Sequence, residues 1–201
     1  MFARGAWGWL GWVAATCVVG AVVFHSMPVR VTHPVGTSDR QAYVLATENR
    51  FAGMPVQHVV YTDSIKQNHE ADGLYLPDEA EVEIRVVDNT LSKADYTEVL
   101  RHEYGHALLY TWCVLDSDGD AAFDNVVHFT AKHADALPAE LAGVGRDYQA
   151  DPDLFGAYAK TSLVEWMAEA YVAYMAGEDV PPSVKSFYDG LHTGLRRPLQ
   201  S

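Results

Sequence analysis

Apolar and charged residues alternate along residues 81–87. The apolar positions are Val82, Ile84 and Val86, and the charged positions are Glu81, Glu83 and Arg85. This period of two is typical of a β-strand with one buried side and one side facing solvent. Short apolar stretches at residues 56–61 and 73–76 predict two further strands. The three strands together predict a small sheet, mixed or antiparallel.

Two long segments have their apolar residues at helical spacing. They predict one helix over residues 95–115 and another over residues 162–175. Asp95, with Glu98 three residues later, is a suitable capping pair for the start of the first helix. The second helix is expected to end at Gly177, because a glycine accepts the left-handed backbone that often follows a helix.

The remaining segments complete the predicted fold. Shorter helices are expected over residues 40–51 and 183–195. An acidic loop is expected at residues 116–124, and the Gly-, Pro- and Asp-rich residues 137–156 predict irregular structure near the cleft of a site. The predicted fold class is therefore α+β, with a small mixed or antiparallel sheet packed against two long helices.

An uncharged apolar stretch lies near the N-terminus. Residues 7–24 carry no charge and follow Arg4, which is the layout of a signal peptide or a membrane anchor. Their length is close to the minimum of about 18 residues for a transmembrane helix. No small-x-small cleavage site stands near Phe24, so we interpret residues 1–27 as an uncleaved signal anchor, with a cleaved signal peptide as the alternative.

The segment after the anchor predicts the domain organisation. Residues 28–39 contain Pro28, Pro34 and Gly36 without periodicity and are expected to form a linker. Residues 40–201 are then one folded domain. We expect this domain to be extracytoplasmic, either anchored to the membrane or secreted after signal cleavage.

Charge and cysteine content narrow the functional classes. The net charge is -13, with 27 acidic residues against 14 Lys and Arg. Such a chain repels phosphate backbones, which argues against a nucleic-acid partner. Of the two cysteines, Cys17 lies in the apolar N-terminal stretch and Cys113 in the domain, so no disulfide is expected within the domain.

A His-Glu-x-x-His motif lies within the first predicted long helix. Residues four apart share one helix face, so His102 and His106 can bind one metal ion. Glu103 stands beside the first histidine, where it can accept a proton from a water on the metal. The motif predicts a zinc metallopeptidase site with Glu103 as general base.

A catalytic zinc site needs a third protein ligand. No histidine stands six residues after His106, so the third ligand of the metzincin pattern is absent. Glu165 and Glu169 share one face of the second helix, and carboxylates on a packing face require a partner or a metal. We expect Glu165 to bind the ion and Glu169 to hydrogen-bond a ligand histidine. His128 and His133 are the alternative third ligands.

Two weaker patterns have simpler interpretations. Residues 116–120 resemble the start of a calcium loop, but the glycine at the sixth position and the glutamate at the twelfth are missing. We interpret this stretch as a solvated turn. Residues 73–76 are a candidate edge strand on which an extended peptide could pair through main-chain hydrogen bonds.

Both helices together resemble one peptidase family. The segments His102-Glu103-Tyr104-Gly105-His106 and Glu165-Trp166-Met167-Ala168-Glu169-Ala170-Tyr171 are similar to those of the anthrax lethal factor and Pro-Pro endopeptidase group of gluzincins. The resemblance covers about residues 95–175. It implies that Glu165 completes the metal site and that Tyr158, seven positions earlier, hydrogen-bonds the oxyanion.

These observations predict a zinc-dependent endopeptidase with one Zn²⁺ ion. Its substrate is a protein or peptide, and its N-terminal segment contacts the membrane. Zinc-activated water hydrolyses the peptide bond, with Glu103 as base and Tyr158 as oxyanion donor. The alternative is a non-catalytic module that binds a partner at the membrane surface and uses the same residues for a structural zinc ion.

Overall fold

The computed structural model describes residues 30–32, 56, 58–62, 65, 71–79, 81–85, 93–116, 120–130 and 136–195. These residues form an α+β fold with a small mixed sheet and several helices, as predicted. The expected anchor at residues 1–27 and the expected helix at residues 40–51 lie outside the described ranges. Among the described helices, none has the length and apolarity that a bilayer crossing requires.

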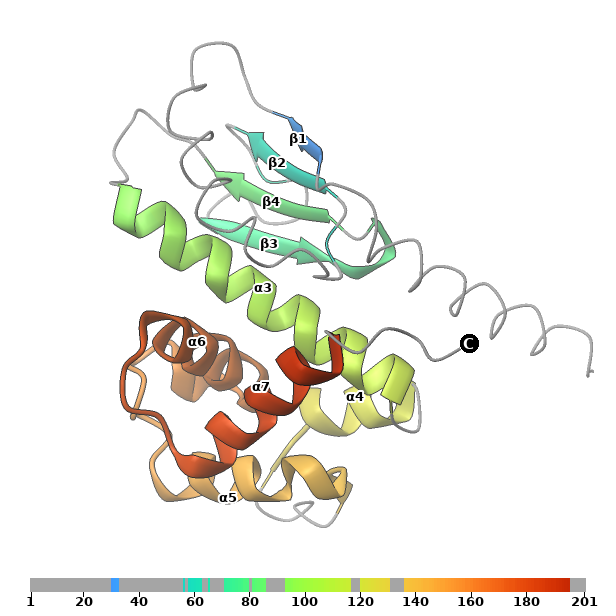
Figure 1. Ribbon diagram of the computed structural model, residues 1–201, viewed down its shortest axis with the longest axis vertical. Helices are drawn as coiled ribbons and strands as arrows, with labels where there is room; N and C mark the ends of the chain where they lie inside the picture. Colours follow the sequence, from blue (N-terminus) through green and yellow to red (C-terminus); the bar gives the residue numbers. More distant parts are fainter. Residues whose placement is uncertain are drawn as a thin grey trace, which may run out of the picture.

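Four strands form the sheet in the order β1-β2-β4-β3 (Figure 1). Their bounds are β1 Arg30–Thr32, β2 His58–Thr62, β3 Gly73–Leu76 and β4 Glu81–Arg85. β1 and β4 pair with β2 in parallel, and β3 pairs with β4 antiparallel. The 3-10 turn Pro77–Glu79 connects β3 to β4. β3 is therefore one of the two edge strands of the described sheet, and β1 is the other.

β1 lies inside the segment that was expected to be a linker. Arg30 pairs with His58, and Thr32 pairs with Val60. The expectation of a stretch without regular structure is wrong for these three residues. A three-residue strand is too short for periodicity to show, and its parallel partner lies more than twenty residues further along the chain.

The prediction that one side of β4 faces solvent is also wrong, because Glu81 and Glu83 are only 6% and 1% exposed. β4 lies between β2 and β3, and both of its faces are covered. The His58 Nδ1 atom lies 2.8 Å from Glu81 Oε2. Such a partner offsets part of the cost of burying a carboxylate. Alternation thus identified the strand but not its burial.

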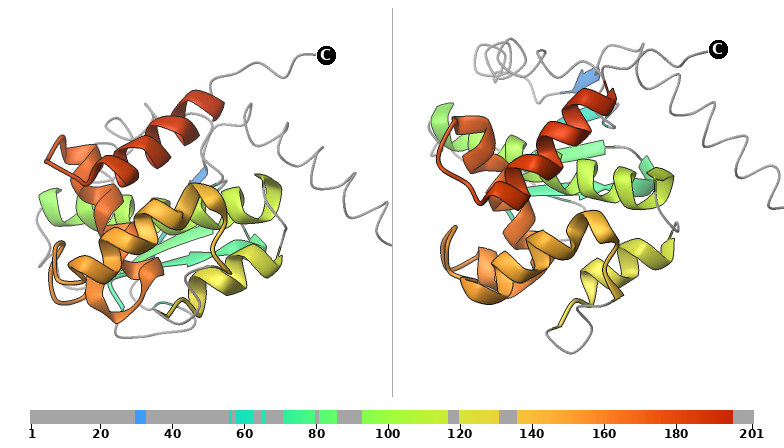
Figure 2. Two further views of the ribbon diagram at one scale, coloured as in Figure 1. Left: turned by 90° about the horizontal axis from the view of Figure 1, so that it is seen from below. Right: turned by 60° about the horizontal axis from the view of Figure 1, so that its bottom comes forward.

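Within the described ranges, five α-helices follow the sheet. They are α3 Lys93–Asp116, α4 Asp120–Val127, α5 Ala142–Ala150, α6 Leu163–Ala176 and α7 Pro182–Leu195. α3 lies between the sheet and the other helices (Figure 1). The views in Figure 2 show α4 beside the C-terminal half of α3, and α5 beside α7. The fold therefore has a sheet layer, a central helix and a layer of shorter helices.

Three details of the helices differ from the sequence prediction. α3 begins at Lys93, so Asp95 lies in its first turn and is not its cap. α4 occupies the second half of the expected acidic loop, since Ala122 and Val126 are buried against the core. α5 forms in a stretch that was expected to be irregular, because buried Val144 gives it an apolar side. Tertiary packing overrides local composition in the last two cases.

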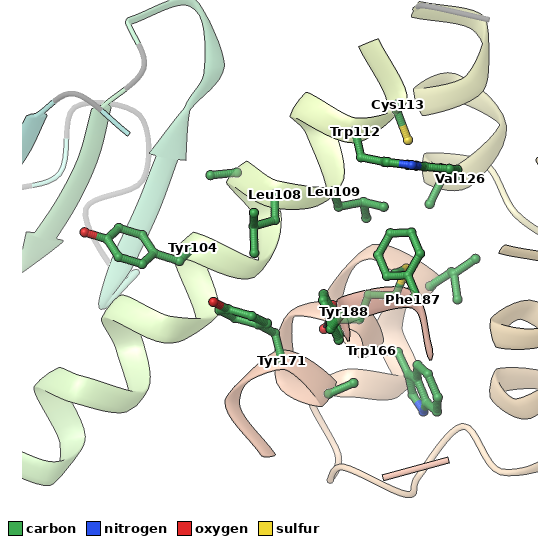
Figure 3. Close-up of a cluster of buried hydrophobic side chains, with 14 of the residues drawn as sticks. Tyr104, Leu108, Leu109, Trp112, Cys113, Val126, Trp166, Tyr171, Phe187 and Tyr188 are labelled. Atoms are coloured by element: carbon green, nitrogen blue, oxygen red, sulfur yellow. Dashed lines mark hydrogen bonds between the residues drawn. The ribbon is translucent and has the colours of Figure 1, made fainter. Parts of the chain in front are cut away.

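The core lies around the central helix. Figure 3 shows aromatic and aliphatic side chains of α3, α6 and α7 in contact. The ring centroids of Trp112 and Phe187 lie 5.2 Å apart in a T-shaped arrangement, which is a favourable geometry for aromatic pairs. The Tyr188 hydroxyl donates to the carbonyl oxygen of Met167, 2.7 Å away, and this joins α7 to α6. The C-terminal half of α3 is apolar on several sides, with Ala107, Leu108, Leu109, Trp112 and Cys113 all buried, because other elements cover it on more than one side.

Both ends of α6 follow from its sequence. Ser162 has an extended backbone, and its hydroxyl accepts a hydrogen bond from the Glu165 N–H at 3.2 Å, as an N-cap does. Gly177 adopts φ 78°, and the N–H of Glu178 donates to the Ala173 carbonyl oxygen at 3.0 Å. This is a glycine C-cap of the Schellman type. The cap at Ser162 fixes where Glu165 stands in the first turn.

α3 and α6 lie close together where two small residues, Gly105 and Ala168, meet. A Cβ atom added to Gly105 would lie 2.9 Å from the Cα of Ala168 and 3.2 Å from the Cβ of Tyr171. Gly105 stands between the two motif histidines, and Ala168 stands between Glu165 and Glu169. The helices therefore cross at the level of these polar side chains.

We predict that Gly105→Ala lowers the free energy of unfolding by about 1–3 kcal/mol, because the overlap with backbone forces the helices apart. It should also weaken metal binding. The control is Gly190→Ala in α7, where an added Cβ has no neighbour within 4 Å. That change should raise stability by up to about 1 kcal/mol. Chemical denaturation checks both values, and equal stability of G105A and wild type would contradict the prediction.

Candidate metal centre

α3 presents its two histidines on one face, one helical turn apart. The Nε2 atoms of His102 and His106 lie 3.0 Å from each other. Their ring centroids are 4.6 Å apart, with an interplanar angle of 83°. Both side chains are largely buried, with exposed fractions of 12% and 16%. The two ring nitrogens thus point at one position, and this position is largely shielded from solvent.

α6 brings a carboxylate to the same point. Glu165 Oε2 lies 3.1 Å from His102 Nε2 and 3.3 Å from His106 Nε2. The three side chains form a group that could hold a metal ion, with all ligand atoms within 4.8 Å of one another. Ligand atoms about 2.0–2.1 Å from a tetrahedral zinc ion lie about 3.3 Å from each other. The observed triangle of atoms is close to one face of such a tetrahedron.

The Glu165 oxygen fits a metal better than a hydrogen-bond network. Oε2 is buried and has no hydrogen bond of good geometry, although two ring nitrogens lie within 3.3 Å. A buried carboxylate oxygen without a hydrogen bond of good geometry is costly. A cation shared by the oxygen and the two nitrogens removes this cost, because all three then direct lone pairs at it. The donor set of two imidazoles and one carboxylate suits zinc.

Glu169 supports the first histidine from the other side of its ring. Its Oε1 atom lies 3.1 Å from His102 Nδ1. A proton on Nδ1 donated to this carboxylate leaves the Nε2 lone pair facing Glu165 and His106. Glu169 therefore fixes the tautomer and the orientation that metal binding requires.

The electrostatics of the metal-free group follow from these contacts. Burial alone would lower the pKa of His102, but the carboxylates of Glu165 and Glu169 raise it to about 10. Burial would raise the pKa of Glu165, whereas the two imidazoles hold it well below its usual range. The two carboxylates thus attract a positive charge, and a proton takes that place when no metal is bound.

Glu103 lies beneath β3 and is only 5% exposed. Burial raises the pKa of its carboxyl, whereas the imidazoles of His102 and His106 oppose this change. A hydrogen bond from the backbone N–H of Tyr75 in β3 also lowers the pKa. A buried carboxylate with a raised pKa is a suitable proton acceptor and donor.

Tyr158 stands at the rim of the centre, with an exposed fraction of 58%. Its ring centroid lies 5.7 Å from that of His102. Partial burial, with the charges of Glu165 and Glu103, raises the pKa of its phenol to about 12. The backbone at this point is held by Thr161, whose Oγ1 donates to the Tyr158 carbonyl oxygen at 2.8 Å. The phenol therefore keeps its proton at neutral pH and is able to donate it.

His128, one of the two alternative ligands, lies outside the group of His102, His106 and Glu165. His128 is exposed, and its Nδ1 lies 3.1 Å from an oxygen of Asp124. The metal-binding group found among the described residues does not include it. His133 lies outside the described ranges, as do residues 117–119 of the calcium-like stretch.

Sequence reasoning missed two glycines that shape the centre. Gly105 permits the close approach of α6, and Gly73 permits the close approach of β3 to Glu103. One signal was available, because Gly105 and Ala168 are small residues at matching places between pairs of polar side chains. No local signal connects Gly73 to Glu103, since they lie on different elements.

Comparison with known proteins adds no identification. No family model matches the chain, and no curated protein matches it. The resemblance to gluzincins thus stays a prediction, based on the motifs of α3 and α6.

We predict that metal affinity rises with pH. At pH 7 a metal ion must displace a proton from His102, whose pKa is about 10 without metal. The association constant should therefore rise by up to about tenfold per pH unit until the pH approaches that pKa. In Glu169→Gln one carboxylate is lost, so the rise should level off at a lower pH. Competition with a chelating dye measures this, and a flat profile between about pH 6 and 9 would contradict it.

Proposed function

We propose that this protein is a zinc-dependent endopeptidase. The observation that carries the proposal is the group of His102, His106 and Glu165, whose ligand atoms all lie within 4.8 Å. Buried Glu103 lies next to His102 in the same helix turn. Two imidazoles, a carboxylate and an adjacent carboxylate base are the parts of a gluzincin-type site.

The number of ligands supports a catalytic site over a structural one. Structural zinc sites use four protein ligands, whereas catalytic sites use three and leave a position for water. Among the residues that the structure describes, the group contains three side chains. A partner-binding module with a closed zinc site would need a fourth ligand, so the enzyme is the better supported of the two functions.

Glu103 moves the proton in the proposed reaction. His102, His106 and Glu165 would hold the zinc ion, which would supply Lewis-acid chemistry: a lower pKa for a bound water and polarisation of the substrate carbonyl. Glu103 accepts a proton from the attacking water and gives it to the departing amine. Its raised pKa favours this transfer, because a carboxylate with a higher pKa is a stronger base and accepts the proton more readily.

Tyr158 and Glu169 complete the mechanism. The Tyr158 phenol lies near the His102 ring and retains its proton, so it can donate a hydrogen bond to the oxyanion that forms on the substrate. Glu169 would accept a hydrogen bond from His102 Nδ1–H and so hold the ring with its Nε2 lone pair towards the metal. These two residues act on the transition state and on the ligand geometry, respectively.

Edge strand β3 supports an extended peptide as substrate. Arg85 N–H donates to the Asp72 carbonyl oxygen at 2.9 Å, which fixes the hydrogen-bond alternation of the β3 and β4 pair. The backbone groups of Gly73 and Tyr75 accordingly point away from β4, towards the edge. A peptide laid along this edge would pair with Gly73 beside Glu103.

The N-terminal sequence supports a location for the enzyme. The uncharged stretch of residues 7–24 is suited to a signal anchor. The proposed enzyme is therefore extracytoplasmic and attached to the membrane, or secreted if the segment is cleaved. Its proposed substrates are proteins or peptides in that compartment.

Exchange of Glu103→Gln tests the proposed function. The amide cannot accept the proton, so zinc-dependent cleavage of a peptide library should fall by about 10²–10⁴-fold while zinc affinity stays unchanged. The control is Glu98→Gln, an exposed glutamate on the same helix, which should cleave at the wild-type rate. Mass-spectrometric profiling with and without chelator measures both. Wild-type turnover by E103Q would refute the mechanism.

Removal of the phenol hydroxyl tests the oxyanion donor. Tyr158→Phe should lower kcat by about 10²–10³-fold, with little change in KM or zinc affinity. Tyr174→Phe is the matched control, because that hydroxyl donates to Asp189 at 2.8 Å and is remote from the ligands. A rise in KM with an unchanged kcat for Y158F would assign Tyr158 to substrate binding instead.

A further inference from the structure

Gly73 lies directly against the side chain of Glu103. A Cβ atom at this position would stand 2.6 Å from Glu103 Oε1 and 2.9 Å from Glu103 Cγ. It would also stand 2.7 Å from Cγ1 of Val99, one turn earlier on α3. Real Cβ atoms do not approach so closely, so any residue with a side chain here would have to displace these two neighbours.

The same strand also holds the Glu103 carboxylate by a hydrogen bond. In an antiparallel pair, alternate residues of an edge strand direct their N–H and C=O groups away from the partner strand. Asp72 bonds to Arg85 of β4, so Gly73 and Tyr75 are the residues that face the edge. The Tyr75 N–H donates to the Glu103 carboxylate. β3 therefore contacts this side chain at two neighbouring backbone positions.

We infer that Gly73 is a positioning residue for the general base. The missing side chain lets the β3 backbone lie against Glu103, and the Tyr75 N–H then fixes the carboxylate. The inference rests on the proposed function, because it assigns Gly73 a part in the same reaction. It goes further in making the edge strand a support for the base as well as a surface for substrate.

The neighbours of Gly73 indicate what an added methyl group would do. Both overlaps are with side-chain atoms, and the Glu103 carboxylate is the flexible end of its side chain. Rotation of that side chain removes the overlap without moving backbone. Glu103 is held by the Tyr75 N–H in its present position, so a rotated carboxylate loses that hydrogen bond and its place beside the two histidines. The expected result is a folded protein with a misplaced base.

The first test is Gly73→Ala in the full chain loaded with zinc. A misplacement of about 1 Å can cost about 10²-fold in rate, so kcat should fall by about 10–100-fold. KM and zinc affinity should stay within about twofold of wild type, because no ligand is touched. Gly190→Ala in α7 is the control, since a methyl group added there has no neighbour within 4 Å. Unchanged kcat in G73A would overturn the inference.

Two double variants identify the contact responsible. In G73A/E103Q the alanine should cost no further activity, because the base that it displaces is already absent. In G73A/V99A the new methyl group no longer overlaps with residue 99 but still overlaps with Glu103. The loss of kcat should therefore persist. Full recovery in G73A/V99A would overturn the inference, since packing against Val99 would then be the cause.

A measurement without turnover separates the inference from the proposed function. In the Co²⁺-loaded protein, G73A should change the visible absorption spectrum in the same direction as E103Q, because both alter the surroundings of the metal. If wild type with zinc cleaves no peptide, the proposed function fails, and the spectrum still tests Gly73. A G73A spectrum identical to that of wild type would overturn the positioning role.

A stability measurement covers the case in which G73A does not fold. Gly73→Ala combined with Glu103→Ala removes the carboxylate and Cγ that the new methyl group meets. Recovery of the unfolding midpoint in G73A/E103A supports the contact with Glu103 as the source of the instability. Continued failure to fold would overturn the inference.

Discussion

The close approach of α3 and α6 is the constraint on which the centre depends. Gly105 and Ala168 meet at the crossing, where a single added methyl group would overlap with backbone. This approach brings Glu165 within 3.3 Å of both histidine nitrogens and Glu169 within 3.1 Å of His102. Ligand distances in a metal site tolerate errors of only a few tenths of an ångström. A helix spacing set by small residues supplies that accuracy, and the apolar contacts of α7 with α6 maintain it.

Charge explains why so polar a group remains in the middle of the fold. Glu103, Glu165 and Glu169 surround two imidazoles in a place with little water. Without a cation, a proton on His102 compensates part of the negative charge, as its raised pKa of about 10 indicates. A divalent ion compensates more of it and also satisfies the buried Glu165 oxygen. The group could therefore hold a metal ion, and binding of an ion would then also stabilise the fold.

The three layers divide the work of the proposed enzyme. The central helix carries two ligands and the base, and the helical layer carries the third ligand and the phenol of Tyr158. The sheet supplies β3, whose backbone holds Glu103. The backbone groups of Gly73 and Tyr75 in this strand point away from β4, towards the edge of the sheet. Substrate, base and metal would therefore meet at the boundary between the sheet and the helices. This boundary is where an extended peptide has access to both a strand edge and the ligand atoms.

The sequence by itself determined the features that depend on neighbours along the chain. The four-residue spacing of His102 and His106 puts both rings on one helix face, and Ser162 and Gly177 mark the ends of α6 by capping. Glu165 could be predicted as a ligand because a carboxylate on a packing face needs a partner. Only the tertiary structure decided that Gly73 lies against Glu103, that Glu83 is buried, and that β1 and α5 form. Their energies come from contacts between segments far apart in the chain, and local periodicity carries no information about such contacts.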